Sequence, residues 1–165
     1  MKTRAQKIAV AAMLAALACV ATMIIKIPTP LKGYVNLGDC VVLLCGSILS
    51  PAYAFLSAGI GSALADILSG YLVYAPATFA IKGSMALITV ALFRYFDKKG
   101  CKPALKILPC IIAEMFMVLG YFVFEGFLYG FGPSLANIPA NAIQGVAGII
   151  FGFTLIKAFE KIKPS

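Results

Sequence analysis

Four ionisable side chains stand inside stretches that are otherwise apolar: Asp66, Lys82, Glu114 and Glu125. Burying a charge among apolar neighbours is costly, so such a side chain usually faces a cavity or an opposite charge. For Asp66 and Lys82 two roles stay open, a structural salt bridge between them and contact with a bound solute. Glu114 and Glu125 are about three helical turns apart and share one helix face. Glu114 lies nearer the basic end of its stretch, which favours a structural or snorkelling role for it.

The segment Asn137–Gly145, NIPANAIQG, aligns three carboxamides. Asn137, Asn141 and Gln144 stand at i, i+4 and i+7, so all three point to one side of a helix. Amides offer both hydrogen-bond donors and acceptors, and they serve helix packing as readily as ligand binding. Because they lie level with Glu125, we favour binding. Tyr121 lies one turn before Glu125, which puts its ring on the same face as that carboxylate.

The elements that must position these side chains are membrane spans. The chain has 165 residues, of which 62% are hydrophobic and 12% charged, and its mean hydropathy is +0.99. A soluble domain has about 25% charged and about 45–50% apolar residues. The composition therefore excludes an ordinary soluble domain, a disordered chain and a nucleic-acid-binding protein. Because a span needs about 20 apolar residues, the length predicts a single all-α integral membrane domain over residues 1–165 with six transmembrane helices.

Apolar runs give the bounds of the expected spans. The second is short for a crossing unless it continues beyond Pro51, and the first is ended by Pro28 and Pro30. Between these two spans, residues 27–39 form a loop rich in turn residues. The six expected spans are Lys7–Lys26, Cys40–Leu49, Tyr53–Val73, Pro76–Tyr95, Ala104–Tyr129 and Leu135–Phe159.

Basic residues predict the orientation. Eleven of the 14 lysines and arginines gather in three clusters, and basic clusters mark the cytoplasmic ends of spans. Six spans place all three clusters on one side, so both termini are predicted to be cytoplasmic. The clusters are Lys2, Arg4 and Lys7; Arg94, Lys98, Lys99, Lys102 and Lys106; and Lys157, Lys161 and Lys163. Lys26 and Lys32 fall on the outer side.

The sequence offers little for catalysis or metal binding. It has no histidine, and its five cysteines form no metal-binding or redox motif. We interpret the cysteines as small apolar residues. We therefore expect no enzyme activity, no metal site and no cofactor, and the chain has no P-loop for ATP.

The first span is rich in alanine. Ala11 with Ala15, and Ala12 with Ala16, are small residues spaced by four, which lets another helix approach closely. Such a pair serves packing within the chain or contact with a partner protein, and the density of alanines raises the second possibility.

Taken together, these segments resemble the substrate-binding S components of energy-coupling factor (ECF) vitamin transporters. The likeness rests on the alanine-rich first span and on four segments in this order: GYVNLGD at 33–39, GSALADILSGY at 61–71, YAPATFAIKG at 74–83 and NIPANAIQG at 137–145.

The resemblance implies a multi-pass protein of a prokaryotic cytoplasmic membrane that binds a water-soluble vitamin tightly near the outer face. Its partners would be a transmembrane coupling protein and two ATPases, whose action topples the S component so that the site turns inward. In relatives the first loop is a lid, which places Tyr34, Asn36 and Asp39 near the site. The expected partner contacts are Ala11, Ala12, Ala15 and Ala16. The expected substrate-binding residues are Tyr34, Asn36, Lys82, Tyr121, Glu125, Asn137, Asn141 and Gln144.

The substrate and some alternatives stay open. Mixed carboxylate, ammonium, amide and phenol groups suit a small heterocycle with hydroxyls, such as pyridoxine or the hydroxymethylpyrimidine precursor of thiamin. Riboflavin and pantothenate remain possible. A self-contained channel or secondary transporter is the main alternative function, although no inverted repeat is evident. A small membrane enzyme is a weaker one, because no catalytic motif is present.

Overall fold

The computed structural model describes residues 3–29, 31 and 33–162. Lys2, Pro30, Lys32 and Lys163, which entered the predictions above, lie outside them. The elements in chain order are α1 (Arg4–Ile24), β1 (Ile27–Pro28), β2 (Tyr34–Val35), α2 (Asp39–Ile48), α3 (Pro51–Leu68), α4 (Ala75–Lys98), the 3-10 helix η1 (Pro103–Ile107), α5 (Leu108–Tyr129), α6 (Phe131–Leu135) and α7 (Ile138–Ile162).

The all-α membrane fold with six helices is confirmed, with one difference in length. Within the described residues, five helical segments are long and apolar enough to cross a membrane, and α2 has only 10 residues. It does not continue beyond Pro51, because Leu49 and Ser50 are extended and Pro51 starts α3. A proline favours the first position of a helix and prevents the preceding residues from continuing one.

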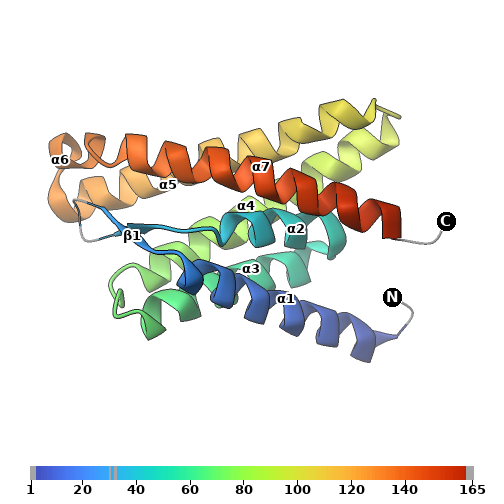
Figure 1. Ribbon diagram of the computed structural model, residues 1–165, viewed down its shortest axis with the longest axis horizontal. Helices are drawn as coiled ribbons and strands as arrows, with labels where there is room; N and C mark the ends of the chain where they lie inside the picture. Colours follow the sequence, from blue (N-terminus) through green and yellow to red (C-terminus); the bar gives the residue numbers. More distant parts are fainter. Residues whose placement is uncertain (1–2, 30, 32, 163–165) are drawn as a thin grey trace.

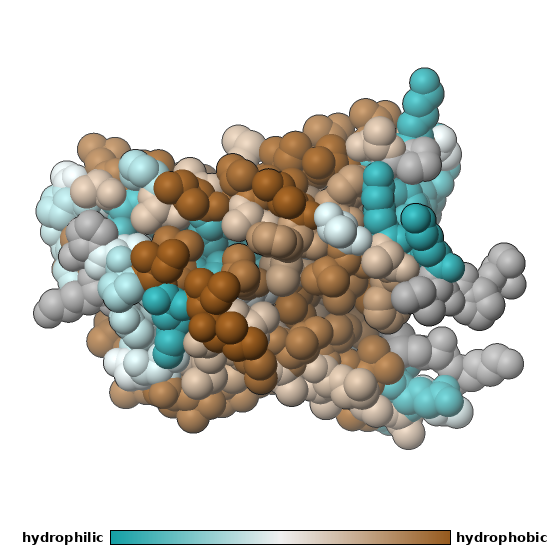
Figure 2. Space-filling model, in the orientation of Figure 1, coloured by the Kyte–Doolittle hydropathy of each residue, from teal (hydrophilic) through white to brown (hydrophobic). Residues whose placement is uncertain are grey.

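The bundle has an apolar middle and two polar ends. Figure 2 shows brown hydrophobic side chains around its centre, with teal hydrophilic ones gathered at both ends. The start of α1, the α4–α5 connection and the end of α7 lie at the same end of the molecule (Figure 1). The described members of the three basic clusters therefore share one end, as six spans require. That this end faces the cytoplasm remains a prediction from the positive-inside rule.

The short helix α2 lies inside the bundle, where it packs against α3, α4 and α7 (Figure 1). Its first eight residues are buried. Glycines permit this close packing: a Cβ on Gly46 would lie 2.8 Å from the Ala86 carbonyl oxygen of α4. On the other side, Gly152 of α7 lies against Leu43 and Cys40. Because α2 lies inside the bundle, its first residue, Asp39, is buried in the interior of the protein.

The alanine-rich helix α1 packs on α3 through small residues. Ser57 Oγ donates a hydrogen bond to the Ala11 carbonyl oxygen over 2.8 Å. A Cβ on Gly61 would clash with the Ala15 carbonyl oxygen, so the two backbones touch there. All five cysteines are free thiols, and three of them are buried, which agrees with their interpretation as small apolar residues.

Candidate substrate-binding site

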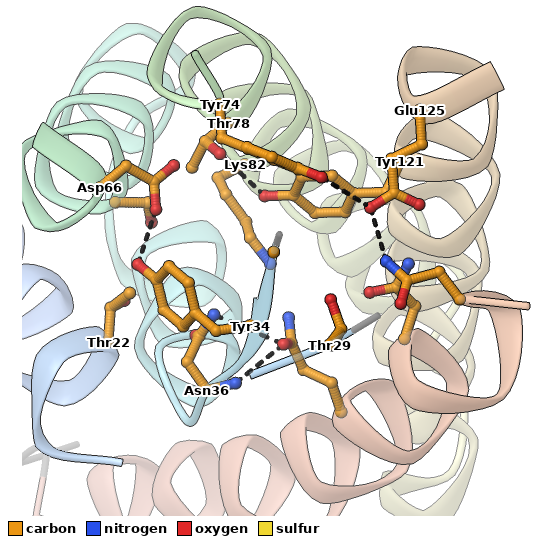
Figure 3. A pocket seen from close by; sticks show the side chains of 15 residues that line it. Thr22, Thr29, Tyr34, Asn36, Asp66, Tyr74, Thr78, Lys82, Tyr121 and Glu125 are labelled. Carbon is orange, nitrogen blue, oxygen red and sulfur yellow. Dashed lines mark hydrogen bonds between the residues drawn. The ribbon is translucent and has the colours of Figure 1, made fainter. Parts of the chain in front are cut away.

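Polar side chains from α3, α4, α5, α7 and the first loop converge on one cavity (Figure 3). The first loop, which contributes to its lining, lies at the end of the bundle away from the basic clusters (Figure 1). All eight residues predicted to bind substrate line the cavity. The cavity volume is about 20 Å³, enough for about one water molecule. Its lining residues are Thr22, Thr29, Gly33, Tyr34, Asn36, Ser62, Asp66, Tyr74, Thr78, Lys82, Tyr121, Glu125, Asn137, Asn141 and Gln144.

The floor of the cavity carries a buried ion pair between Lys82 of α4 and Asp39 of α2. The side chains are 2% and 0% exposed. Gln144 Nε2 donates a second hydrogen bond to the Asp39 carboxylate over 2.7 Å, and the Lys82 ammonium lies 5.4 Å from the centre of the Tyr121 ring. The salt bridge between Lys82 and Asp66, one of the two roles left open by the sequence, is not formed, because Lys82 pairs with Asp39 instead. The sequence alone could not predict the Lys82–Asp39 pair. Asp39 lies beside Lys82 because the short helix α2 is buried inside the bundle.

The α5–α7 side of the cavity is built around Glu125. Asn137 Nδ2 donates a hydrogen bond to Glu125 Oε1 over 2.6 Å, and the Tyr74 hydroxyl approaches the same oxygen at 3.3 Å. The predicted alignment of Asn137, Asn141 and Gln144 is confirmed, since all three side chains are buried and line the cavity. Glu125 Oε2 and Asn137 Oδ1 have no hydrogen-bond partner within the described part of the chain. Two acceptors are thus left for a ligand.

The first loop covers the cavity. The β1–β2 pairing, with Pro28 opposite Tyr34, folds the loop back on itself. The Tyr34 hydroxyl then donates to Asp66 Oδ1 over 2.6 Å, and the backbone N–H of Asn36 donates to Gln144 Oε1 over 2.9 Å. Burial raises the pKa of Tyr34 above its usual value, and the hydrogen bond to Asp66 raises it further, so this phenol stays a neutral donor.

The Tyr74 side chain also holds the loop down. Its hydroxyl donates to the Leu31 carbonyl oxygen over 2.7 Å, in addition to its contact with Glu125. Burial raises the pKa of Tyr74, and the Glu125 carboxylate raises it further. Tyr34, Leu31 and Asn36 of the loop are therefore tied to α3, to the start of α4 and to α7, respectively.

Glu114 lies outside the cavity lining. Its side chain is 3% exposed and packs against Gly145 and Gly148 of α7, close to Asp39. The snorkelling role is therefore wrong, because the carboxylate points between helices rather than toward the surface. Neither of its oxygens has a hydrogen-bond partner among residues 3–29, 31 and 33–162.

The structure separates the alanines of α1 into two faces. Ala11 is buried against α3 and Ala15 is half-buried beside Gly61, so this pair packs within the chain. Ala12 and Ala16 are exposed on the other face. Of the four residues predicted to contact a partner, these two remain accessible for it.

Several lining residues were not among the predicted binding residues. Ser62 and Asp66 lie at i and i+4 on α3, and Thr78 and Lys82 have the same spacing on α4. This spacing was visible in the sequence and could have added Ser62 and Thr78 to the predicted set. For Thr22 and Thr29, no comparable spacing in the sequence indicated a place in the cavity lining.

Comparisons with known proteins agree on one family. The model of the family described as "ECF-type riboflavin transporter, S component" matches residues 2–161. An uncharacterised protein of Pyrococcus woesei is 35% identical over 134 residues, which are 81% of this chain and 87% of that protein. The thiamine precursor transporter HmpT of Lactococcus lactis subsp. cremoris (strain MG1363) is 25% identical over 138 residues, 80% of this chain and 75% of the relative.

A solved structure supports the same fold. It is described as "Structure and mechanism of the S component of a bacterial ECF transporter", and it superposes with a TM-score of 0.73 at 24% identity, covering 98% of this chain and 100% of that one. The chain belongs to the riboflavin-type family of ECF transporter S components, which are multi-pass membrane proteins that bind a substrate for transport and are not enzymes.

Proposed function

We propose that this S component binds a small heterocyclic vitamin or vitamin precursor, of the pyridoxine or hydroxymethylpyrimidine type, in the cavity between α3, α4, α5, α7 and the first loop. The observation that carries the proposal is the convergence of all eight predicted polar residues on this one cavity. Small-molecule sites are concave and use a few well-placed polar groups to fix the orientation of the ligand, and this cavity offers such groups from these four helices and the first loop.

The size of the cavity favours a small substrate. At about 20 Å³ it must expand to admit any vitamin, and each displaced side chain gives up packing and hydrogen bonds. A single-ring compound demands less displacement than the three-ring system of riboflavin. The name of the Lactococcus relative, a thiamine precursor transporter, points to the same size class, whereas the name of the matching family points to riboflavin.

For transport, we infer that the protein works with an ECF transmembrane coupling protein and two ATPases, and that it topples in the membrane to release substrate inward. The exposed Ala12–Ala16 face of α1 supports a helix-to-helix contact of this kind. Large apolar residues on the same helix, such as Met13 and Leu17, are also exposed.

Binding and uptake measured side by side test the proposal. The purified protein is titrated with pyridoxine, hydroxymethylpyrimidine, riboflavin and pantothenate, and uptake is followed in cells with and without an ECF module. We expect tight binding of pyridoxine or hydroxymethylpyrimidine, and sustained uptake only with the module. Tighter binding of riboflavin or pantothenate would overturn the substrate assignment, and uptake without the module would instead indicate a self-contained transporter.

A further inference from the structure

We propose that Asp66 and Ser62 of α3 form a second polar subsite of the cavity, which accepts hydrogen bonds from an amino, hydroxyl or cationic group of the substrate. This inference rests on the proposed function, because it assigns a further contact in the same site. It places a recognition point on the α3 side of the cavity, where Asp66 lies across from Glu125 of α5 (Figure 3). Glu125 in turn accepts a hydrogen bond from Asn137.

The two side chains are buried and incompletely bonded. Asp66 is 4% exposed and Ser62 is 1% exposed, and both line the cavity. Asp66 Oδ1 accepts the Tyr34 hydroxyl over 2.6 Å. Asp66 Oδ2 and Ser62 Oγ, however, have no hydrogen-bond partner among the residues that the structure places. A buried polar atom left unpaired costs about 1–3 kcal/mol, so a ligand that pairs with it gains affinity.

The neighbouring polar groups are engaged elsewhere. Lys82 forms its ion pair with Asp39. The Thr78 hydroxyl lies close to the Asp66 carboxyl and also stands at hydrogen-bond distance, 3.0 Å, from the Tyr121 hydroxyl. By hydrogen-bond geometry within the described residues, Tyr34 is the partner of Asp66 Oδ1, and Asp66 Oδ2 has none.

The charge of the cavity defines the class of ligand. Two carboxyl groups line it, Asp66 and Glu125, and its one lining ammonium group among the described residues, Lys82, is paired with Asp39. The unpaired buried atoms include Asp66 Oδ2, Glu125 Oε2 and Asn137 Oδ1, all of which accept hydrogen bonds. The arrangement matches a neutral or cationic heterocycle that donates hydrogen bonds at two edges. It opposes ligands that carry a carboxylate or phosphate, because their negative charge would meet both acids.

Substitutions on α3 test this subsite. Binding of pyridoxine, hydroxymethylpyrimidine and their monophosphates is measured for the natural chain, for Asp66→Asn and for Ser62→Ala. The control is Asp97→Asn, an exposed acid at the other end of α4. We expect Asp66→Asn and Ser62→Ala each to weaken binding of the preferred vitamin about 5- to 150-fold. The control should change nothing, and the monophosphates should bind the natural chain at least about tenfold more weakly than their parent compounds.

Tyr34→Phe separates direct contact from loosening of the loop. It removes the hydrogen bond to Asp66 Oδ1 and leaves the open oxygen in place, so it should weaken binding less than Asp66→Asn does. If Tyr34→Phe reproduces the whole loss, or if Asp66→Asn and Ser62→Ala bind normally while Glu125→Gln does not, the subsite is refuted and the proposed function stands. If the natural chain binds none of the heterocycles, the proposed function itself fails. Unchanged melting temperatures of the variants show that the fold is intact.

Discussion

Removing the Lys82 ammonium should destabilise the protein strongly. Lys82→Met keeps much of the side-chain volume but leaves the Asp39 carboxylate fully buried, with the Gln144 amide as its remaining hydrogen-bonding side chain in the described part of the protein. Breaking a buried ion pair by removing one member costs about 3–5 kcal/mol. For a chain of this size that corresponds to a melting temperature lower by roughly 6–20 °C. Asp39→Asn should have a similar effect, since it leaves a buried ammonium group without its counter-charge.

The double variant identifies the partner. Replacing both Lys82 and Asp39 removes both charges, so it should be less harmful than the sum of the two single changes, with a coupling energy of about 1–3 kcal/mol. The same cycle with Asp66→Asn in place of Asp39→Asn should give a clearly smaller coupling. The assay is unfolding of the purified protein in detergent, followed by circular dichroism. A Lys82–Asp66 coupling as large as the Lys82–Asp39 coupling would refute the arrangement of the cavity floor.

Three further predictions concern binding, coupling and packing. Glu125→Gln or Asn141→Ala should weaken vitamin binding by about 1–3 kcal/mol, because each removes a buried polar contact; titration of the purified variants checks this, and unchanged affinity for both would remove them from the site. Ala12→Leu should leave binding intact while co-purification with the ECF module and uptake are lost, and equal loss of binding would indicate misfolding instead. Gly61→Ala should lower the free energy of unfolding by about 1–3 kcal/mol, because the new methyl group would meet the Ala15 carbonyl oxygen; an unchanged melting temperature would contradict the close α1–α3 contact.

Local patterns in the sequence predicted much of the fold and of the site. Apolar runs and prolines located the spans, and carboxamides at i, i+4 and i+7 predicted that Asn137, Asn141 and Gln144 share a face. Those features depend on residues close together in the chain, where helix geometry relates spacing to direction. The prediction that the loop residues Tyr34 and Asn36 bind substrate rested on the resemblance to S components, and no residue spacing supported it.

Contacts between distant residues could not be predicted in the same way. The sequence left Asp66 open as a partner of Lys82, and only the buried position of α2 in the structure places Asp39 beside Lys82 instead. The position of Glu114 near the basic end of its span suggested a side chain that reaches the surface. In the structure, two glycines of α7 leave room for its carboxylate between the helices. The alanine pairs of α1 are equivalent in sequence, and only the position of α3 buries Ala11 while leaving Ala12 exposed.

Native mass spectrometry of the protein purified from its source tests the central claim most directly. That claim is that the polar side chains gathered at one end of the bundle form a single binding site for a small vitamin. We predict one bound heterocycle per chain, neutral or basic, that is retained by Asp97→Asn and lost from Asn141→Ala. A chain that carries only lipid, or a heterocycle that stays bound to both Glu125→Gln and Asn141→Ala, would contradict it.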